Sequence, residues 1–307
     1  MKVSYYPGCT LKDKTTNLDD STKAAAEALD IDMVELPEWT CCGATHPLTE
    51  EKIINLVPQI RILSNVRTEG NDSVTTTCAF CYNTLKRANK AVIDDPIKRQ
   101  RMNAFLKDDK RIPEYDKETV YDFKEYNGET KVVHFLEILR DTIGFETLSN
   151  RVTKKLEGLK VAPYYGCQLL RPPEEVDLDD PENPSILEDF LRSLGCEVVN
   201  FPFKSECCGS YLSLSAPDAA TRASHTILRS ALKNGAEAVT LSCPLCYYNM
   251  DKRQDNILKL YADFSTVPVF FFTQLLALAL GVDESVMGWN KHHIDPTPLL
   301  KEKGFLS

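Results

Sequence analysis

The chain has 307 residues, a formal net charge of −9 and eleven cysteines, and 43% of its residues are hydrophobic. This length suffices for two ordinary domains that each bury a core without disulfides or metals, so stability alone does not account for the cysteines. Acidic residues are spread along the chain, which argues against a nucleic-acid binder, because such proteins need a basic surface.

The setting is expected to be reducing. The first nine residues, MKVSYYPGC, lack the features of a secretory signal peptide, so we expect a cytoplasmic protein. In that compartment clustered cysteines are metal ligands or redox thiols more often than disulfides. The most apolar run, residues 267–282, falls short of a bilayer span and predicts a buried strand followed by a core helix.

Strand and helix patterns alternate along the first half. In chain order we expect a strand at 2–6, a helix at 15–30, a strand at 31–37, a helix at 50–67 and a strand at 73–78. Residues 96–129 are rich in charge and are expected to form an inserted surface loop. Residues 131–144 then predict a short strand that passes into a helix ending at glycine.

The second half repeats this order of elements. Its expected elements are a strand at 160–167, a helix at 185–194, strands at 196–202 and 238–243 on either side of a helix at 217–234, and a strand and helix at 268–281. Alternation of this kind favours a mainly parallel α/β sheet in each half.

The repeat is clearest in the cysteines. Each half has one cysteine, then an adjacent pair followed by glycine, and then a Cys-x-x-Cys pair followed by tyrosine. The first set is Cys9, Cys41, Cys42, Cys78 and Cys81, and the second is Cys167, Cys207, Cys208, Cys243 and Cys246. We therefore predict two tandem, pseudo-symmetric domains at 1–150 and 151–285, and a C-terminal tail at 286–307.

Each cysteine group follows a predicted strand. Sites in open parallel sheets form beyond the carboxyl ends of the strands, so the three groups of one half are expected to converge. A redox dithiol needs two cysteines, and zinc or a cubane cluster takes four. Five thiols, with Gly43 or Gly209 allowing a sharp turn at the adjacent pair, indicate a polynuclear cluster. A two-site zinc scaffold is the alternative.

The cysteine pattern resembles the duplicated CCG domain, and residues 1–282 are similar to the B subunit of heterodisulfide reductase. The resemblance implies that each five-cysteine set holds a noncubane [4Fe-4S] cluster. It also implies that the two clusters, facing one cleft, reduce the mixed disulfide of coenzyme M and coenzyme B or a related disulfide. The alternative is an electron-transfer or assembly subunit of a lactate, glycolate, succinate or glycerol-phosphate oxidoreductase.

The same resemblance implies partners. Electrons would come from a ferredoxin-like two-cluster subunit and a flavin-containing, electron-bifurcating subunit, with a hydrogenase or formate dehydrogenase upstream. No G-x-G-x-x-G motif follows the early strands, so we expect no flavin or nucleotide on this chain.

Three further residues are candidates for the chemistry. His46, four residues past Cys42, is a candidate proton donor, because histidine titrates near neutral pH. Lys12 and Arg171 occupy similar places after the first cysteine of each set and are candidates for binding an anionic substrate. A surface position is the alternative for all three.

The remaining histidines and the eleventh cysteine are expected to have structural roles. His134 lies in an apolar run and is expected to be a core histidine. Cys196 is expected to be a small buried side chain. Surface roles are expected for His225, His292 and His293.

Overall fold

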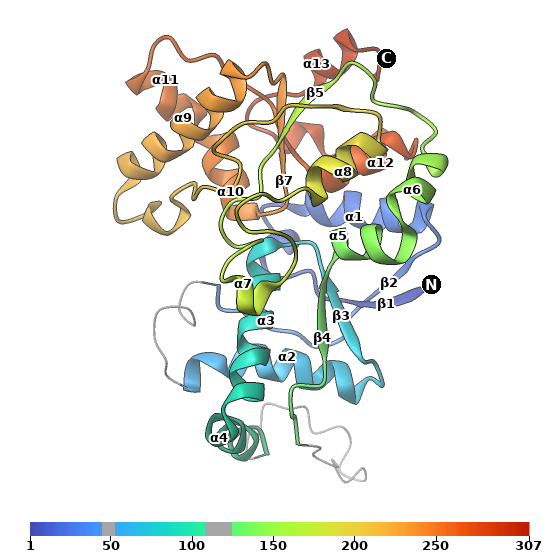
Figure 1. Ribbon diagram of the computed structural model, residues 1–307, viewed down its shortest axis with the longest axis vertical. Coiled ribbons are helices and arrows are strands. Elements are labelled where there is room, and N and C mark those ends of the chain that lie inside the picture. Colours follow the sequence, from blue (N-terminus) through green and yellow to red (C-terminus); the bar gives the residue numbers. More distant parts are fainter. Residues whose placement is uncertain (45–52, 108–124, 307) are drawn as a thin grey trace.

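The computed structural model describes residues 1–44, 53–107 and 125–306, and these form two four-stranded parallel sheets (Figure 1). The strand order is β2-β1-β3-β4 in the first sheet and β6-β5-β7-β8 in the second. The strands are β1 (Lys2–Tyr5), β2 (Asp32–Glu35), β3 (Ser73–Thr76), β4 (Lys131–His134), β5 (Lys160–Pro163), β6 (Glu197–Val198), β7 (Ala238–Leu241) and β8 (Val269–Phe271). The shared order confirms the predicted pair of pseudo-symmetric α/β units.

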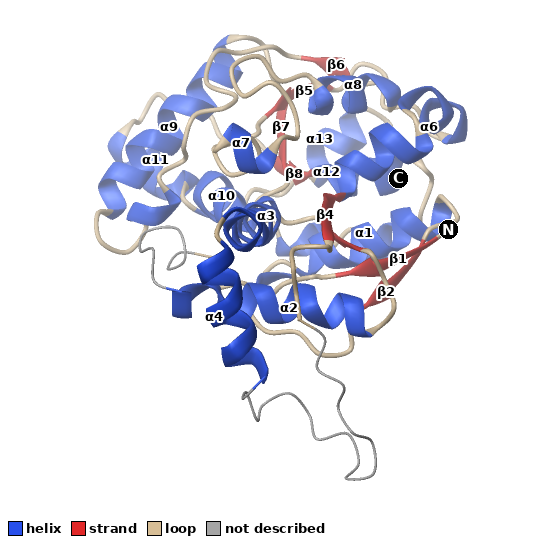
Figure 2. Cartoon of the chain, turned by 60° about the horizontal axis from the view of Figure 1, so that its bottom comes forward, coloured by secondary structure: helices blue, strands red, loops and turns tan. Residues whose placement is uncertain are grey.

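Helices connect and cover the strands (Figure 2). The α-helices are α1 (Thr16–Ala28), α2 (Val57–Thr68), α3 (Ala79–Asp94), α4 (Pro96–Lys107), α5 (Phe135–Glu137), α6 (Phe145–Arg151), α7 (Pro173–Val176), α8 (Ile186–Ser193), α9 (Pro217–Lys233), α10 (Pro244–Tyr247), α11 (Gln254–Leu260), α12 (Phe272–Ala279) and α13 (Thr297–Glu302). Short 3₁₀ or π segments are η1 (Thr10–Lys12), η2 (Ile53–Leu56), η3 (Ile138–Ile143), η4 (Ser210–Leu212), η5 (Tyr248–Lys252), η6 (Glu284–Val286) and η7 (Trp289–Lys291).

Burial follows the position of a strand in its sheet. All four residues of β7, which lies between two neighbours, are buried, as is typical of a central strand in a parallel sheet. The edge strand β2 instead alternates between exposed and partly buried residues, as a strand with one free side does.

The two halves share one core. Helix α1 of the first half packs against α12 of the second, and Ser21 Oγ lies 2.7 Å from Thr273 Oγ1 in this buried contact. The ring of Phe272 contacts both Phe135 and Phe190, so aromatic packing is continuous across the boundary. The two sheets are therefore held in a fixed relation by buried apolar surface.

Part of the segment at 96–129 is not the surface loop that we expected. Residues 96–107 form α4, and its Met102 and Leu106 are almost fully buried. Asn103 also donates to the Tyr126 carbonyl and accepts from the Tyr126 N–H, both at 2.9 Å, which closes the segment onto the core. Residues 108–124 lie outside the described part of the chain.

The C-terminal residues are more buried than expected. Met287 and Leu300 have no exposed surface, and the side chain of His292 contacts Gln274 at 2.8 Å. The surface role predicted for His292 is therefore wrong, since apolar packing of the tail carries it inside. His293 is exposed and pairs with Asp255 at 2.8 Å, as a surface residue would.

The surface role predicted for His225 is wrong as well. Its ring is buried in a stack on Tyr261, with centroids 3.6 Å apart. His134 and Cys196 are buried as predicted, and burial raises the pKa of the Cys196 thiol to about 12. The predicted domain boundaries at 150 and 285 stay predictions.

Candidate functional site

The five cysteines of the first half converge beyond the carboxyl ends of the strands. Cys9 Sγ lies 3.4 Å from Cys41 Sγ, and Cys42 Sγ lies 3.6 Å from Cys81 Sγ. The thiols of Cys41 and Cys42 also interact, as do those of Cys78 and Cys81. The five sulfurs therefore form one connected group, which we call the first cysteine site.

The second half builds the same group, the second cysteine site. Cys208 Sγ lies 3.4 Å from Cys246 Sγ, the Cys167 thiol interacts with that of Cys207, and the Cys243 thiol interacts with that of Cys246. None of these cysteines forms a disulfide, so all remain available as ligands.

Each cysteine site has a buried side and an open side. The two Cys-x-x-Cys pairs and the second member of each adjacent pair are buried. Cys9, Cys41 and Cys207 are exposed, and Cys167 is partly exposed. Among the described residues, the first two cysteines of each set thus form the side of the site that is open to a small molecule.

Backbone N–H groups point at the first member of each adjacent pair. Gly43 and Gly209 have φ angles of +74° and +77°, which confirms the sharp turn predicted there, and each N–H lies 3.4 Å from the sulfur of the first cysteine in its pair. The Cys42 thiol and the Gly43 N–H help lower the pKa of Cys41 to about 2. The Cys167 thiol and the Gly209 N–H help lower the pKa of Cys207 to about 6. Both surroundings favour the thiolate, the form that binds metal.

A tyrosine holds the loop of each adjacent pair, a role that sequence reasoning missed. Tyr6 donates to the carbonyl of Thr40 at 2.8 Å, and Tyr164 donates to that of Glu206 at 2.7 Å. Thr40 and Glu206 each precede an adjacent cysteine pair. The repeated tyrosines before Cys9 and Cys167 were the signal that pointed to this shared support.

The carbonyl between the cysteine pair and its glycine is also fixed in both halves. Gln59 of α2 donates to the Cys42 carbonyl at 2.5 Å, and Asn249 of η5 donates to the Cys208 carbonyl at 3.0 Å. These contacts satisfy a buried acceptor and hold the turn in place.

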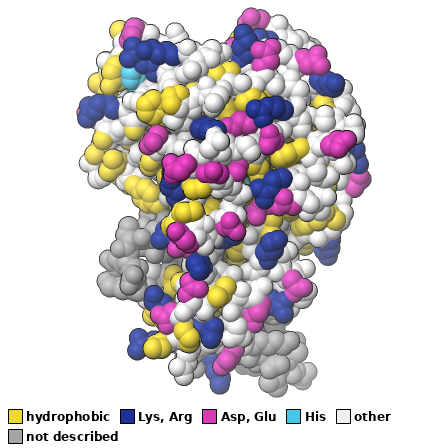
Figure 3. Space-filling model, viewed as in Figure 1, with side chains coloured by type: hydrophobic (Ala, Val, Ile, Leu, Met, Phe, Trp, Pro, Cys, Tyr) yellow, Lys and Arg dark blue, Asp and Glu magenta, His cyan; other side chains and the backbone are white. Residues whose placement is uncertain are grey.

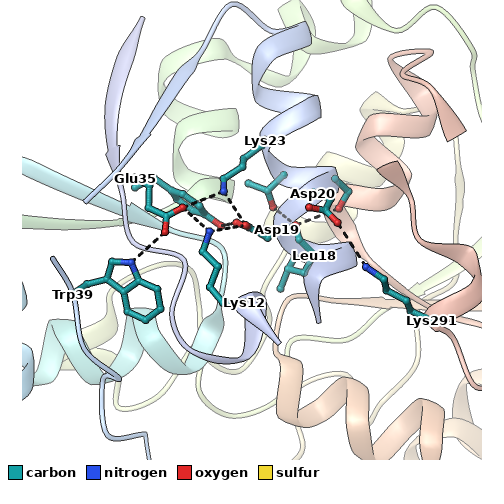
Figure 4. Close-up of polar contacts among 11 residues, drawn as sticks. Lys12, Leu18, Asp19, Asp20, Lys23, Glu35, Trp39 and Lys291 are labelled. Carbon is teal, nitrogen blue, oxygen red and sulfur yellow. Dashed lines mark hydrogen bonds and ion pairs between the residues drawn. The ribbon is translucent and has the colours of Figure 1, made fainter. Parts of the chain in front are cut away.

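Lys12 lies in a cluster of charges beside the first cysteine site (Figure 4). Its Nζ is 3.2 Å from Asp19 and 2.5 Å from Glu35, and Lys23 contacts the same two carboxylates at 2.8 and 3.1 Å. Trp39 Nε1 donates to Glu35 at 3.2 Å. This cluster ties η1, α1 and the end of β2 together, so the charge of Lys12 is already compensated.

Arg171 is likewise engaged by the protein. Its guanidinium donates to the carbonyls of Ser205 at 3.1 Å and Pro181 at 2.9 Å, and it pairs with Glu182 at 2.9 Å. These contacts brace the loop before Cys207. Substrate binding by Lys12 and Arg171 stays a prediction, and His46 lies outside the described residues.

Helix α3 links the two cysteine sites. It begins at the first Cys-x-x-Cys pair, and the ring of Phe80 within that motif lies 5.5 Å from the ring of Tyr211, just after Cys207-Cys208-Gly209. Asn83 donates to the carbonyls of Gln168 and Arg171 at 2.8 and 2.6 Å. The cysteine loops of the second half thus rest on the helix that carries two cysteines of the first.

The donor set fits a sulfur-rich polynuclear group. Among the described residues, no three His, Cys, Asp or Glu side chains surround a point suited to a single metal ion. Instead, five soft thiols lie in an extended connected group in each half, and soft thiolates are the ligands preferred by iron–sulfur clusters.

The family follows from the sequence comparisons. A family model described as a cysteine-rich domain, CCG, matches residues 3–86 and 161–251, which are the two halves that carry the cysteine sites. The chain belongs to this cysteine-rich CCG family.

Two relatives match this CCG protein over nearly its whole length. It is 32% identical to the 8-methylmenaquinol:fumarate reductase membrane anchor subunit of Wolinella succinogenes, across 97% of this chain and 99% of that protein. It is 28% identical to the B subunit of the ferredoxin/F420H2-dependent CoB-CoM heterodisulfide reductase of Methanosarcina acetivorans, across 95% of this chain and 94% of that protein. These likenesses support a redox subunit with iron–sulfur chemistry.

A solved structure shares the fold. A hypothetical protein from Helicobacter pylori matches 95% of this chain with a TM-score of 0.71 and 13% identity, and the match spans about half (51%) of that longer protein. In the part of the CCG chain that the structure describes, no helix has the length and apolar character needed to cross a membrane.

Proposed function

We propose that this CCG protein is the catalytic subunit of a heterodisulfide reductase complex, in which two noncubane [4Fe-4S] clusters reduce a disulfide to two thiols. The observation that carries the proposal is the pair of complete five-cysteine sites, built alike and joined through α3. Cys9, Cys41, Cys42, Cys78 and Cys81 would hold one cluster, and Cys167, Cys207, Cys208, Cys243 and Cys246 the other.

Reduction of a disulfide consumes two electrons and two protons and yields two thiols. When bound, the clusters supply the one-electron steps and iron atoms that accept thiolate sulfur. Two adjoining sites suit this stoichiometry. The exposed first cysteines leave a path for the disulfide, while buried Cys-x-x-Cys pairs shield the opposite side from water.

The chain's own residues position these sites. Tyr6 and Tyr164 fix the adjacent cysteine pairs, and Asn83 fixes the loop of Cys167 against α3. His46 remains our candidate for delivering a proton to the departing thiolate. Electrons would enter from a ferredoxin-like partner subunit and a flavin subunit, since no G-x-G-x-x-G motif follows the early strands of this chain.

A second function is electron transfer in a quinol-linked fumarate or succinate system. The relative from Wolinella succinogenes favours it, because it is named as part of a methylmenaquinol:fumarate reductase. Apolar side chains near the second cysteine site agree with it: Leu214 is 97% exposed and Leu212 is 43% exposed, on the loop that follows Gly209.

Turnover by anaerobically purified, reduced protein separates the two functions. The heterodisulfide of coenzyme M and coenzyme B should reoxidise the reduced chain and yield both thiols. A menaquinone analogue should not reoxidise it at a comparable rate. Fast reoxidation by the quinone with no thiol released from the disulfide would favour the second function and overturn the first.

A further inference from the structure

One face of α3 is directed at the second half of the protein. Phe80, Asn83 and Arg87 are spaced three and four residues apart, which places them along one stripe of the helix. Phe80 contacts Tyr211, and Asn83 binds the carbonyls of Gln168 and Arg171. Arg87, one turn beyond Asn83, therefore lies over the same border, between η4 and the loop of Cys167.

Arg87 differs from the other cations near the cysteine sites. It is half-buried, and within the described residues it has no hydrogen-bond or ion-pair partner. Lys12 is held by two carboxylates, and Arg171 by two carbonyls and a carboxylate. The helical neighbour of Arg87, Lys86, donates to the carbonyl of Val176. Across the described part of the chain, Arg87 thus makes no ion pair.

Arg87 and cysteines of the second cysteine site act electrostatically on the same side chain, Tyr211. Burial, followed by Cys167, raises the pKa of Tyr211, while the charge of Arg87 acts in the opposite direction. Cys243 and Cys207 act on the same phenol. Tyr211 is 39% exposed, so this border is open to solvent.

Two buried oxygen atoms at the border also lack partners among the described residues. Asn83 is fully buried, and its Oδ1 accepts no hydrogen bond although its Nδ2 donates twice. The Oε1 of Gln168 is buried without a partner, while its Nε2 contacts the Cys167 sulfur at 3.5 Å. Because the nitrogens are engaged, each of these oxygens has acceptor capacity that the described residues do not fill.

We propose that Arg87 binds the anionic group of a small thiol or disulfide at the open side of the second cysteine site. This inference rests on the proposed function. The guanidinium offers a paired set of donors to a sulfonate, phosphate or carboxylate. Arg87 is thereby a residue that selects anionic over neutral substrates.

A matched pair of thiols tests the proposal on the full-length protein with its clusters. The probes are 2-mercaptoethanesulfonate, which is anionic, and 2-mercaptoethanol, which is neutral and otherwise of the same length. Each is titrated against the oxidised protein, and the half-saturating concentration is read from the change in the electron paramagnetic resonance or visible spectrum of the clusters. This readout requires no turnover.

We expect the wild-type protein to bind the anionic thiol roughly ten-fold more tightly than the neutral one, a typical effect of one charge-assisted contact. The Arg87→Gln variant should lose this preference and bind the neutral thiol as before. Arg87→Lys should keep part of the preference, and added salt should weaken it in the wild type more than in Arg87→Gln. Lys90→Gln, which removes an exposed charge from the same helix, should change neither titration.

Two results overturn the proposal in distinguishable ways. If Arg87→Gln keeps the full preference for the anionic thiol, Arg87 does not select the ligand, although thiol binding and the proposed function stand. If neither thiol alters the cluster spectrum of the wild-type protein, direct thiol chemistry is wrong, and the role of Arg87 falls with it.

Discussion

Gly8 and Gly166, just before the first cysteine of each set, determine how closely the loop can approach a cysteine sulfur of the Cys-x-x-Cys pair. Both have positive φ angles, +79° and +64°. A Cβ at Gly8 would lie 2.7 Å from Cys81 Sγ, and one at Gly166 would lie 3.3 Å from Cys246 Sγ. Glycine is therefore required at these positions for two reasons: the backbone conformation, and the close contact with a cysteine sulfur.

Gly8→Ala is expected to empty the first cysteine site while leaving the second intact. The added methyl group displaces Cys81, so under the proposed function, in which the two sites hold like clusters, iron per chain should fall by about half relative to the wild type. Gly70→Ala is the matched control, because Gly70 has a φ of +76° but nothing within 4 Å of the place that an added methyl group would take. Both variants should lose about 1–2 kcal/mol of stability from the backbone alone. Equal iron content in the two variants would show that the contact with Cys81 is unimportant.

His134 makes stability depend on pH. Its Nε2 contacts the Thr77 carbonyl at 3.1 Å and its Nδ1 accepts from the Leu136 N–H at 3.2 Å, so the ring is bound in its neutral form. Burial lowers its pKa to about 3. The unfolded chain takes up a proton near its ordinary pKa of about 6.5 and the folded chain does not, so stability falls as the pH decreases below that value.

Because of His134, the free energy of unfolding should be about 2 kcal/mol lower at about pH 5 than at about pH 7. Urea unfolding at the two pH values measures the loss. His134→Asn, which can still accept from the Leu136 N–H, should be less stable at neutral pH but should show a smaller difference between the two pH values. An unchanged pH dependence in the variant would assign the effect to other groups.

At the scale of elements, the charge cluster of Lys12, Asp19, Lys23 and Glu35 connects η1, α1 and β2 beside the first cysteine site (Figure 4). Asp19, which is 4% exposed, accepts from Tyr5 at 2.8 Å and pairs with both Lys12 and Lys23. Burial acts to raise the pKa of Glu35, but its contacts with the two lysines outweigh burial and lower it overall. The cluster therefore has a structural role in joining η1 to α1 and β2.

Asp19→Asn should destabilise the protein by about 3 kcal/mol, because it leaves two lysines sharing one carboxylate around a buried position. Its neighbour provides the control. Asp20 is exposed and pairs with Lys291 at 3.7 Å, so Asp20→Asn should change stability by less than about 1 kcal/mol. Chemical denaturation of both variants measures the difference, and equal losses would contradict the structural role of the cluster.

Helix α3 is the second element with a joining role, because it supports cysteine loops of both halves. Asn83→Ala removes two hydrogen bonds to the Gln168 and Arg171 carbonyls and should cost roughly 1–3 kcal/mol. The loop of Cys167 should then loosen, so the variant should lose iron from the second cysteine site although the substitution lies in the first half. Lys90→Ala, which removes a partly exposed side chain paired only with Asp94 near the end of the same helix, should retain both stability and iron. Full iron content in Asn83→Ala would show that the halves are independent.

The alternation of strands and helices, and the order of the cysteine groups, were predictable because both depend on local pattern. The sharp turn at Gly43 and Gly209 followed from the residue type. The burial of His292 and His225 was not predictable, since it depends on how the tail and α9 pack in three dimensions. Whether a cation such as Lys12 is compensated also depends on packing, because its partners Asp19 and Glu35 lie 7 and 23 residues away.

For the molecule as a whole, duplication explains ten of the eleven cysteines and the shape. Two like sheets present two like cysteine sites, and the α1–α12 contact and α3 keep them together. Lys and Arg side chains are interspersed with Asp and Glu on the described part of the face seen in Figure 3, so no continuous basic surface is present there. A negatively charged substrate that approaches this face must therefore rely on a local cation rather than on a general field.

The proposed function requires that each half hold a polynuclear iron–sulfur cluster in its five-cysteine site. Iron, acid-labile sulfide and zinc analysis of anaerobically purified protein is the sharpest test of this requirement. We expect about eight iron and about eight sulfide per chain, as two [4Fe-4S] clusters require, with little zinc. Two zinc ions per chain with no sulfide would contradict this expectation and would support a two-site zinc scaffold.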